Sequence, residues 1–140
     1  MAFNGKLLEL KTGNSWVNVP MDFFALESYS ATPDQRMESS ANRATSGKLV
    51  RTTVEHTATK IEFNTPPITN REVAVLNGLL SAAYTDELER KVEARYYDPA
   101  TDSYKTGEFY VPDVEYPIYR VDLETNTVYY KSLRYALIEY

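Results

Sequence analysis

Short stretches rich in β-favouring residues alternate with polar turns along most of the chain. Residues 7–10 (LLEL) and 16–19 (WVNV) flank a polar stretch whose Gly13 can take a positive φ. This arrangement predicts a β-hairpin near the start of the sequence. Residues 23–29 (FFALESY) follow and have the composition of a further strand.

One long extended run spans residues 49–64. Its apolar residues occupy even-numbered positions between Val50 and Ala58, and odd-numbered positions from Ile61 onward. Successive side chains of a strand point to opposite faces, so this switch of parity predicts a bulge or a sharp bend.

A single segment has helical periodicity, and it follows a Pro-Pro pair. Thr69 and Glu72 form a T-x-x-E capping box, which marks the start of a helix. We expect this helix at about residues 70–84, with Gly78 marking close packing on a sheet and weakening the helix by about 1 kcal/mol relative to Ala. Its apolar stripe comprises Val73, Leu76, Leu80 and Ala83, with Leu79 and Tyr84 beside it.

Alternation returns after the helix, in closely spaced strands. Ten of the twelve tyrosines lie between Tyr96 and Tyr140, a density typical of sheets and contact surfaces. Strands are expected at residues 108–111 and 118–123. A strand is also expected after the helix, with one face formed by Leu88, Val92, Ala94 and Tyr96.

The last predicted strand, residues 128–140, is apolar on both faces, so both faces must be covered. The helix can cover part of one face, and a partner subunit is the natural candidate for the remainder. Tyrosine is enriched at subunit interfaces and in cross-strand pairs. Tyr129 and Tyr135 are therefore predicted subunit contacts.

Residues 30–48 are polar, lack periodicity and predict a long loop. Two interpretations have equal weight at this point. The loop is either a surface excursion without a role, or an arm that becomes ordered against a neighbouring subunit. In the second case Arg36, Met37, Arg43 and Lys48 are the predicted contacts.

Composition limits the chemistry. The 140 residues suit one domain, residues 1–140, and contain no cysteine and no run long enough for a membrane span. No secretion signal is expected from the first residues. The net charge is −5 and no glycine-rich phosphate loop is present, so binding of nucleic acid by charge neutralisation is not expected.

Candidate catalytic and metal residues do not form a constellation. His56 is the one histidine, so it cannot build a histidine-based metal site or a relay, and we expect it at the surface or an interface. Asp98 and Asp102 lack the spacing of a calcium loop and are typical of a turn. We therefore predict no catalytic, cofactor or metal site and no enzymatic activity.

These elements together predict a mainly β (α+β) domain. Two antiparallel sheets would pack as a sandwich or a barrel-like structure, with one flanking helix and a long loop at about residues 30–48.

Three segments are similar to small tail proteins of long-tailed bacteriophages and prophages. They are NRATSGKLVRTTV, the helix start PPITNREVAVLNGLL, and VEARYYDPATDSYKTGEFYVPDVEYPIY. Together with the sheets and the helix, they resemble the tail-tube fold. The resemblance implies a homo-oligomeric ring, commonly hexameric, around a channel through which DNA passes without specific binding. The long loop would then reach a neighbouring subunit.

The implied function is structural: a tail-tube, hub or adaptor component of a virion tail, made in the bacterial cytoplasm, with other tail proteins as partners and no membrane or cofactor. The alternative is a small tyrosine-rich module that binds a carbohydrate or another cell-surface ligand. Exposed tyrosines would converge on one concave patch in a binding module, and would spread along opposite flanks in a ring component.

Overall fold

The computed structural model describes residues 2–140, apart from the side chains of residues 37–40 and 54. The strands are β1 (Leu8–Thr12), β2 (Ser15–Asn18), β3 (Ser30–Arg43), β4 (Leu49–Asn64), β5 (Ile68–Thr69), β6 (Tyr84–Asp86), β7 (Lys91–Asp98), β8 (Ser103–Tyr110), β9 (Ile118–Asp122), β10 (Thr127–Tyr130) and β11 (Arg134–Glu139). Helix α1 spans Asn70–Ala83. The fold is mainly β (α+β), as the sequence predicts, with packed antiparallel sheets and one α-helix in the described residues.

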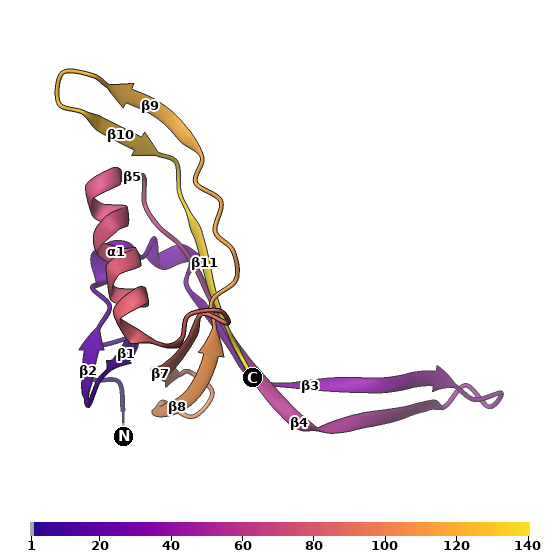
Figure 1. The fold of residues 1–140 in the computed structure, drawn as a ribbon. Coiled ribbons are helices and arrows are strands. Elements are labelled where there is room, and N and C mark those ends of the chain that lie inside the picture. Colours follow the sequence, from indigo (N-terminus) through magenta and orange to yellow (C-terminus); the bar gives the residue numbers. More distant parts are fainter. Residues whose placement is uncertain (1) are drawn as a thin grey trace.

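The strands form a large and a small antiparallel sheet (Figure 1). The large sheet has the order β2-β1-β7-β8-β11-β4-β3, with β6 added beside β7. The small sheet has the order β5-β10-β9. Two hairpins project from the body: β9–β10 at the top of Figure 1, and the outer part of β3–β4 to the right.

Helix α1 begins where its capping box predicts. The Thr69 hydroxyl accepts a hydrogen bond from Glu72 N, and the Glu72 carboxylate accepts one from Thr69 N at 3.3 Å. The predicted stripe faces the core, and its buried residues are Val73, Leu76, Leu80 and Ala83. Gly78 does not pack closely: a Cβ at this position would have no heavy atom within 4 Å.

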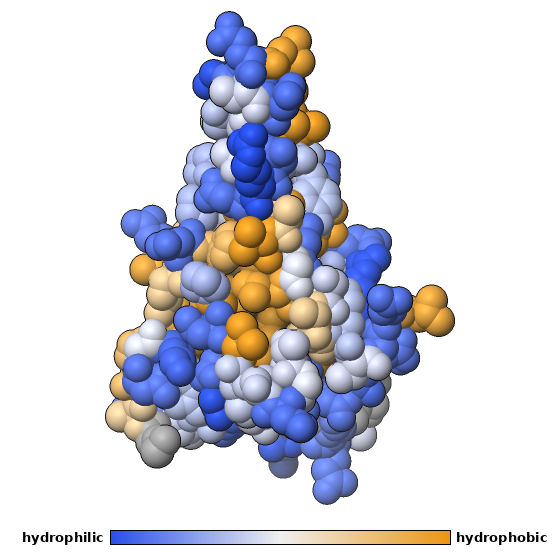
Figure 2. Space-filling model, turned by 60° about the vertical axis from the view of Figure 1, so that its left-hand side comes forward, coloured by the Kyte–Doolittle hydropathy of each residue, from blue (hydrophilic) through white to orange (hydrophobic). Residues whose placement is uncertain are grey.

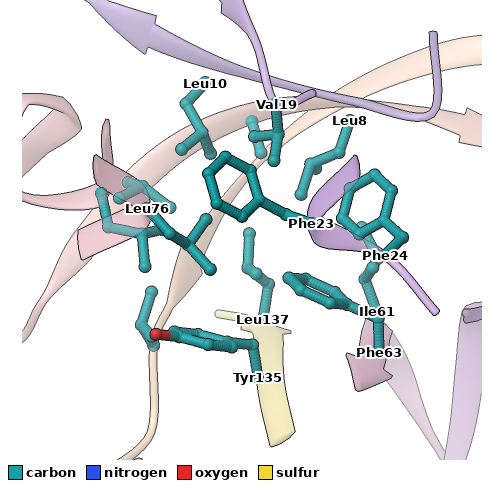
Figure 3. Close-up of a cluster of buried hydrophobic side chains, with 14 of the residues drawn as sticks. Leu8, Leu10, Val19, Phe23, Phe24, Ile61, Phe63, Leu76, Tyr135 and Leu137 are labelled. Atoms are coloured by element: carbon teal, nitrogen blue, oxygen red, sulfur yellow. The ribbon is translucent and has the colours of Figure 1, made fainter. Parts of the chain in front are cut away.

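The core lies between α1, the large sheet and the segment that follows β2 (Figure 3). Phe23 and Phe24 both enter it, although they are adjacent in sequence. A regular strand points adjacent side chains to opposite faces, so the prediction of a strand at residues 23–29 is wrong. Two 3₁₀ turns, Met21–Phe23 and Leu26–Ser28, occupy this segment instead.

The long strand and the N-terminal hairpin form as predicted. β4 spans Leu49–Asn64, and its pairing with β3 shifts register three times, so the bulge inferred from the parity switch is confirmed. After the helix, Leu88 lies in the turn before β7 and is 98 % exposed, which corrects its placement on the strand face.

The last predicted strand is two strands in different sheets. β10 belongs to the small sheet and β11 lies between β8 and β4 in the large one. The chain crosses at Leu133, whose N–H donates to the Thr65 hydroxyl at 3.0 Å and whose carbonyl accepts from Thr65 N at 2.8 Å. Both faces of β11 are therefore covered within the same chain, where Tyr135, Ala136 and Leu137 are all buried.

Candidate interaction surfaces

The segment predicted as a long loop is a strand. β3 covers Ser30–Arg43 and pairs antiparallel with β4 from Ser30↔Glu62 to Arg43↔Leu49. Periodicity did not reveal it, because strand alternation is visible only where one face is buried and the other is not. The remaining connection, residues 44–48, is the hairpin turn.

We call the part of this hairpin beyond the Gln35↔Ala58 pair the arm, residues 36–57, and its end, residues 41–53, the arm tip. Every side chain of the arm tip is exposed. In Figure 1 the arm extends away from the body. The turn is held by the Ala44 N–H, which donates to Lys48 O at 2.7 Å, and by Gly47, which has φ +86. The turn is thus built locally, without support from the core.

The predicted contact residues lie along this arm. Arg36 donates to Glu55 O at 3.2 Å across the ribbon, and Arg43 donates to Gly47 O at 3.0 Å at the turn. Lys48 is exposed beside them. The side chain of Met37 lies outside the described residues.

The arm tip is basic, a feature that sequence reasoning missed. Residues 41–53 contain Arg43, Lys48 and Arg51 and no acidic residue, so their formal charge is +3. The whole chain carries −5, so the remaining residues carry −8. The missed signal was local: three basic residues and no acid fall within thirteen positions of a chain whose net charge is −5.

The β9–β10 hairpin is a second exposed surface. Ile118, Tyr119 and Val121 are each more than half exposed on β9, and Leu123 in the turn is 82 % exposed. Within residues 2–140, β9 pairs with β10 and with no other strand. Edge strands with exposed apolar side chains are sites where another chain can pair.

Tyr129 lies on β10 of this hairpin, partly buried beneath its neighbours. The Arg120 guanidinium lies 4.8 Å from its ring centroid, and the Tyr119 ring lies 6.2 Å away. The surroundings of Tyr129 thus belong to an exposed surface, as a subunit contact requires. Its role in contacts between subunits stays a prediction.

Tyr135 is buried and does not lie on the outer surface of the molecule. It is 1 % exposed, and its ring stacks on Phe63 at 5.6 Å (Figure 3). Its hydroxyl donates to Asn77 Oδ1 at 2.9 Å, and Asn77 Nδ2 donates to the Tyr116 hydroxyl at 3.0 Å. The prediction of Tyr135 as a subunit contact is wrong in this fold, because α1 and the core already cover the side chain.

An open cavity of about 650 Å³ lies beside this network, between the second half of α1 and the loop that follows β8. Tyr84, Tyr116 and Tyr135 line it, together with Arg90. Arg90 is paired with Asp113, whose carboxylate lies 2.6 Å from the guanidinium. Burial raises the pKa of the Tyr135 hydroxyl, and the nearby Tyr116 raises it further. The cavity therefore offers aromatic faces, the neutral hydroxyl of Tyr135 and the ion pair of Arg90 with Asp113.

The other tyrosines form pairs between neighbouring segments. Tyr97 lies opposite Tyr104 across β7 and β8, with ring centroids 5.8 Å apart. The Tyr119–Tyr129 contact likewise joins β9 to β10, so these tyrosines meet across neighbouring strands. The most exposed tyrosines, Tyr116, Tyr119 and Tyr140, belong to different segments of the chain.

The remaining candidate residues are His56, Asp98 and Asp102. His56 is exposed, and its Nε2 lies 2.9 Å from Tyr140 O. Asp98 and Asp102 flank the predicted turn between β7 and β8. Among the described residues, no group of three or more histidine or acidic side chains is placed to hold a metal ion. Within residues 2–140, no helix has the length and apolar character needed to cross a membrane.

Figure 2 shows the face that carries α1, with an apolar area below the projecting β9–β10 hairpin. Val75 on α1 is 57 % exposed.

No curated protein matches the chain. The model of a family of unknown function, DUF6711, matches residues 1–140, and the chain therefore belongs to that family.

Proposed function

We propose that the protein is a structural component of a bacteriophage or prophage tail, which assembles into a ring or tube around a DNA channel. The single observation that carries the proposal is the arm. A ribbon of two strands, exposed at every described side chain of its tip, extends from a well-packed body.

A two-stranded hairpin alone in water is at best marginally stable. Ordering one residue costs roughly 1–2 kcal/mol of backbone entropy, and the arm tip buries no side chain that could offset this cost. A second chain that pairs with or covers the ribbon would supply the missing burial. A long arm of this kind is therefore better suited to contacts between subunits than to the stability of the monomer.

The rest of the proposal follows from the resemblance to the tail-tube family. The partners would be further copies in a ring, hexameric in the simplest case, and other tail proteins of the virion. Synthesis would take place in the bacterial cytoplasm, and no enzymatic activity is proposed. Away from the arm, the chain is acidic, which suits a lumen that does not retain DNA.

The test removes the arm at its base, together with the contact between His56 Nε2 and Tyr140 O. Residues 36–57 are replaced by Asn-Gly, which joins the paired residues Gln35 and Ala58 through a two-residue hairpin turn. Mass photometry and negative-stain electron microscopy across a concentration series compare this variant with the wild type. Rings or tubes formed by the wild type and lost in a folded variant support the proposal, whereas identical oligomers from both chains contradict it.

The alternative, a binding module for a carbohydrate or another cell-surface ligand, is favoured by the tyrosine-lined cavity. Its volume suits a small ligand, and aromatic faces with hydroxyl groups are typical of sugar sites. The exposed tyrosines do not gather there, however, since Tyr119 and Tyr140 lie outside the lining. A glycan array probed with wild type and with Tyr116→Ala separates the two functions: binding that the variant loses would favour the module.

A further inference from the structure

We propose that the arm tip of one copy docks on the β9 hairpin of a neighbouring copy. This inference rests on the proposed function, because it names the surface that receives the arm. The receiving surface, which we call the β9 segment, is formed by residues 112–126: the end of the loop after β8, β9 itself and the turn to β10.

The two surfaces have opposite charge. The arm tip has three basic residues and no acid, a formal charge of +3. The β9 segment itself has one basic residue, Arg120, and four acids, a formal charge of −3. Those acids are Asp113, Glu115, Asp122 and Glu124. Two neighbouring cations lie on it, Arg90 at 2.6 Å from Asp113 and Arg71, which donates to Thr125 O at 3.0 Å, and the charge of the surface with them is −1. Complementary charge guides two surfaces to each other and fixes their register.

Both surfaces also expose apolar side chains between the charges. Leu49 and Val50 on the arm tip are 43 % and 57 % exposed. On the β9 segment, Ile118 and Val121 are 57 % and 53 % exposed. Apolar contact would therefore accompany the ion pairs, as it does at the centres of stable interfaces.

Backbone geometry provides a third match. β9 is an edge strand of the small sheet, and β3 is an edge strand of the large one. Unpaired N–H and C=O groups on such edges can form a ladder with another strand. Pairing of β3 with β9 would satisfy both edges at once and join the sheets of two copies.

The same charges disfavour symmetric pairing. Two arm tips would bring +3 against +3, and two β9 segments with their neighbouring cations would bring −1 against −1, so contact between two arm tips is the most strongly opposed. Contact between unlike surfaces is heterologous, and repeated heterologous contacts produce closed rings or open helical filaments. The charge pattern therefore favours the kind of contact that a ring or a tube needs.

The experiment reverses charge on each surface separately. The arm-reversed variant carries Arg43→Glu and Lys48→Glu, which changes the arm tip from +3 to −1. The hairpin-reversed variant carries Glu115→Lys and Glu124→Lys, which changes the β9 segment from −3 to +1. Lys6→Glu and Glu27→Lys, both at exposed positions elsewhere, are the controls of each sign, and each changes the net charge by half as much as a reversed variant does. Circular dichroism checks that each chain is folded.

Each reversed variant alone should need a protein concentration at least tenfold higher than the wild type to assemble, since its arm and its β9 segment now repel. The controls should assemble as the wild type does. An equimolar mixture of the two variants should recover oligomers, because each arm then meets a β9 segment of opposite charge. Mass photometry of the mixture measures this recovery.

Other results distinguish failure of the docking contact from failure of the proposed function. If the arm-reversed variant fails and the hairpin-reversed variant assembles normally, the arm functions in assembly but docks elsewhere, and the inference is overturned while the proposed function stands. If both reversed variants assemble like the wild type, the inference fails. If the wild type stays monomeric at all concentrations, both the self-assembly of the chain and the inference fail.

Discussion

The ammonium of Lys105 lies 2.7 Å from Oδ2 of Asp98, a carboxylate with no solvent-exposed surface at the end of β7. Oδ1 of Asp98 accepts a hydrogen bond from Ala100 N at 2.9 Å. Burial alone would raise the pKa of Asp98, but the bonds from Lys105 and Ala100 outweigh it and hold the pKa below its ordinary value. Lys105 also lies 3.5 Å from Asp34 Oδ2, so one cation joins β8 to the base of β3.

Asp98→Asn should lower the free energy of unfolding at pH 7 by about 2 kcal/mol, since it removes a hydrogen bond to a charged group and leaves an amide facing Lys105. A folded-state pKa below the ordinary 3.8 means that the stabilisation is complete above that pH and is lost as the pH falls through the lower value. Urea denaturation from about pH 7 to about pH 2 should show a constant difference above pH 3.8 and converging stabilities below it. The control is Asp102→Asn, at an exposed position, and equal stabilities of Asp98→Asn and wild type at pH 7 would contradict the prediction.

Arg95→Ala should lower the free energy of unfolding by about 2–3 kcal/mol, because Glu9 is 2 % exposed and would lose its charge partner. Arg95 Nη2 and Nε lie 2.6 Å and 3.3 Å from the two Glu9 oxygens, and its guanidinium lies 4.7 Å from the ring centroid of Trp16. The chain has one tryptophan, so fluorescence reports this site directly during denaturation. The double variant Arg95→Ala with Glu9→Gln should recover part of this loss in the free energy of unfolding. If it recovers none, the loss comes mainly from the missing contact between Arg95 and Trp16.

The elements recovered from the sequence are those whose signal is local. A capping box and an apolar stripe specify α1 within fifteen residues, and turn chemistry around Gly13 specifies the first hairpin. The arm lacked such a signal because neither of its faces is buried, so its polar sequence resembles a loop. The strand character of its first half comes from pairing with β4, across as many as 21 positions between Arg36 and Thr57.

The surfaces were only partly predictable for a related reason. Arg43 and Lys48 were predicted as contacts from their place in a long polar segment, and both are exposed on the arm tip, while their contact with a partner stays a prediction. Tyr135 was misplaced because apolar residues on both faces of a strand indicate burial without saying which part of the molecule covers them. The chain itself covers β11 through α1 and the 3₁₀ segment. Exposure of Ile118 and Val121 could not be inferred, since β-branched residues on both faces of a strand are equally typical of a buried strand.

Stability should fall steeply above pH 10. Burial and the nearby Tyr104 raise the pKa of Tyr29 above its ordinary 10.0, and burial with Tyr116 does the same for Tyr135. A raised folded-state pKa means that the contribution is complete below pH 10 and is lost as the pH rises toward the folded value, by up to about 1.4 kcal/mol per pH unit for each group. Thermal unfolding between pH 8 and pH 11.5 measures the decline. Tyr135→Phe should flatten it, and an unchanged slope would show that the Tyr135 hydroxyl ionises freely in the folded protein.

Gly78→Ala should raise the free energy of unfolding by about 1 kcal/mol. Gly78 lies inside α1, its φ is not positive, and a Cβ there would meet nothing within 4 Å, so the substitution adds helix propensity without a clash. Gly107→Ala is the opposing control, since its Cβ would lie 2.5 Å from Glu139 Oε2 and 3.2 Å from Phe109 Cε1. The Glu139 carboxylate is held by Thr59 N at 2.8 Å and cannot move freely, so this variant should lose about 1 kcal/mol. Urea midpoints measure both. A destabilised Gly78→Ala with an unaffected Gly107→Ala would mean that the cavity wall beside α1 is closed in solution and requires glycine for packing, as the sequence alone suggested.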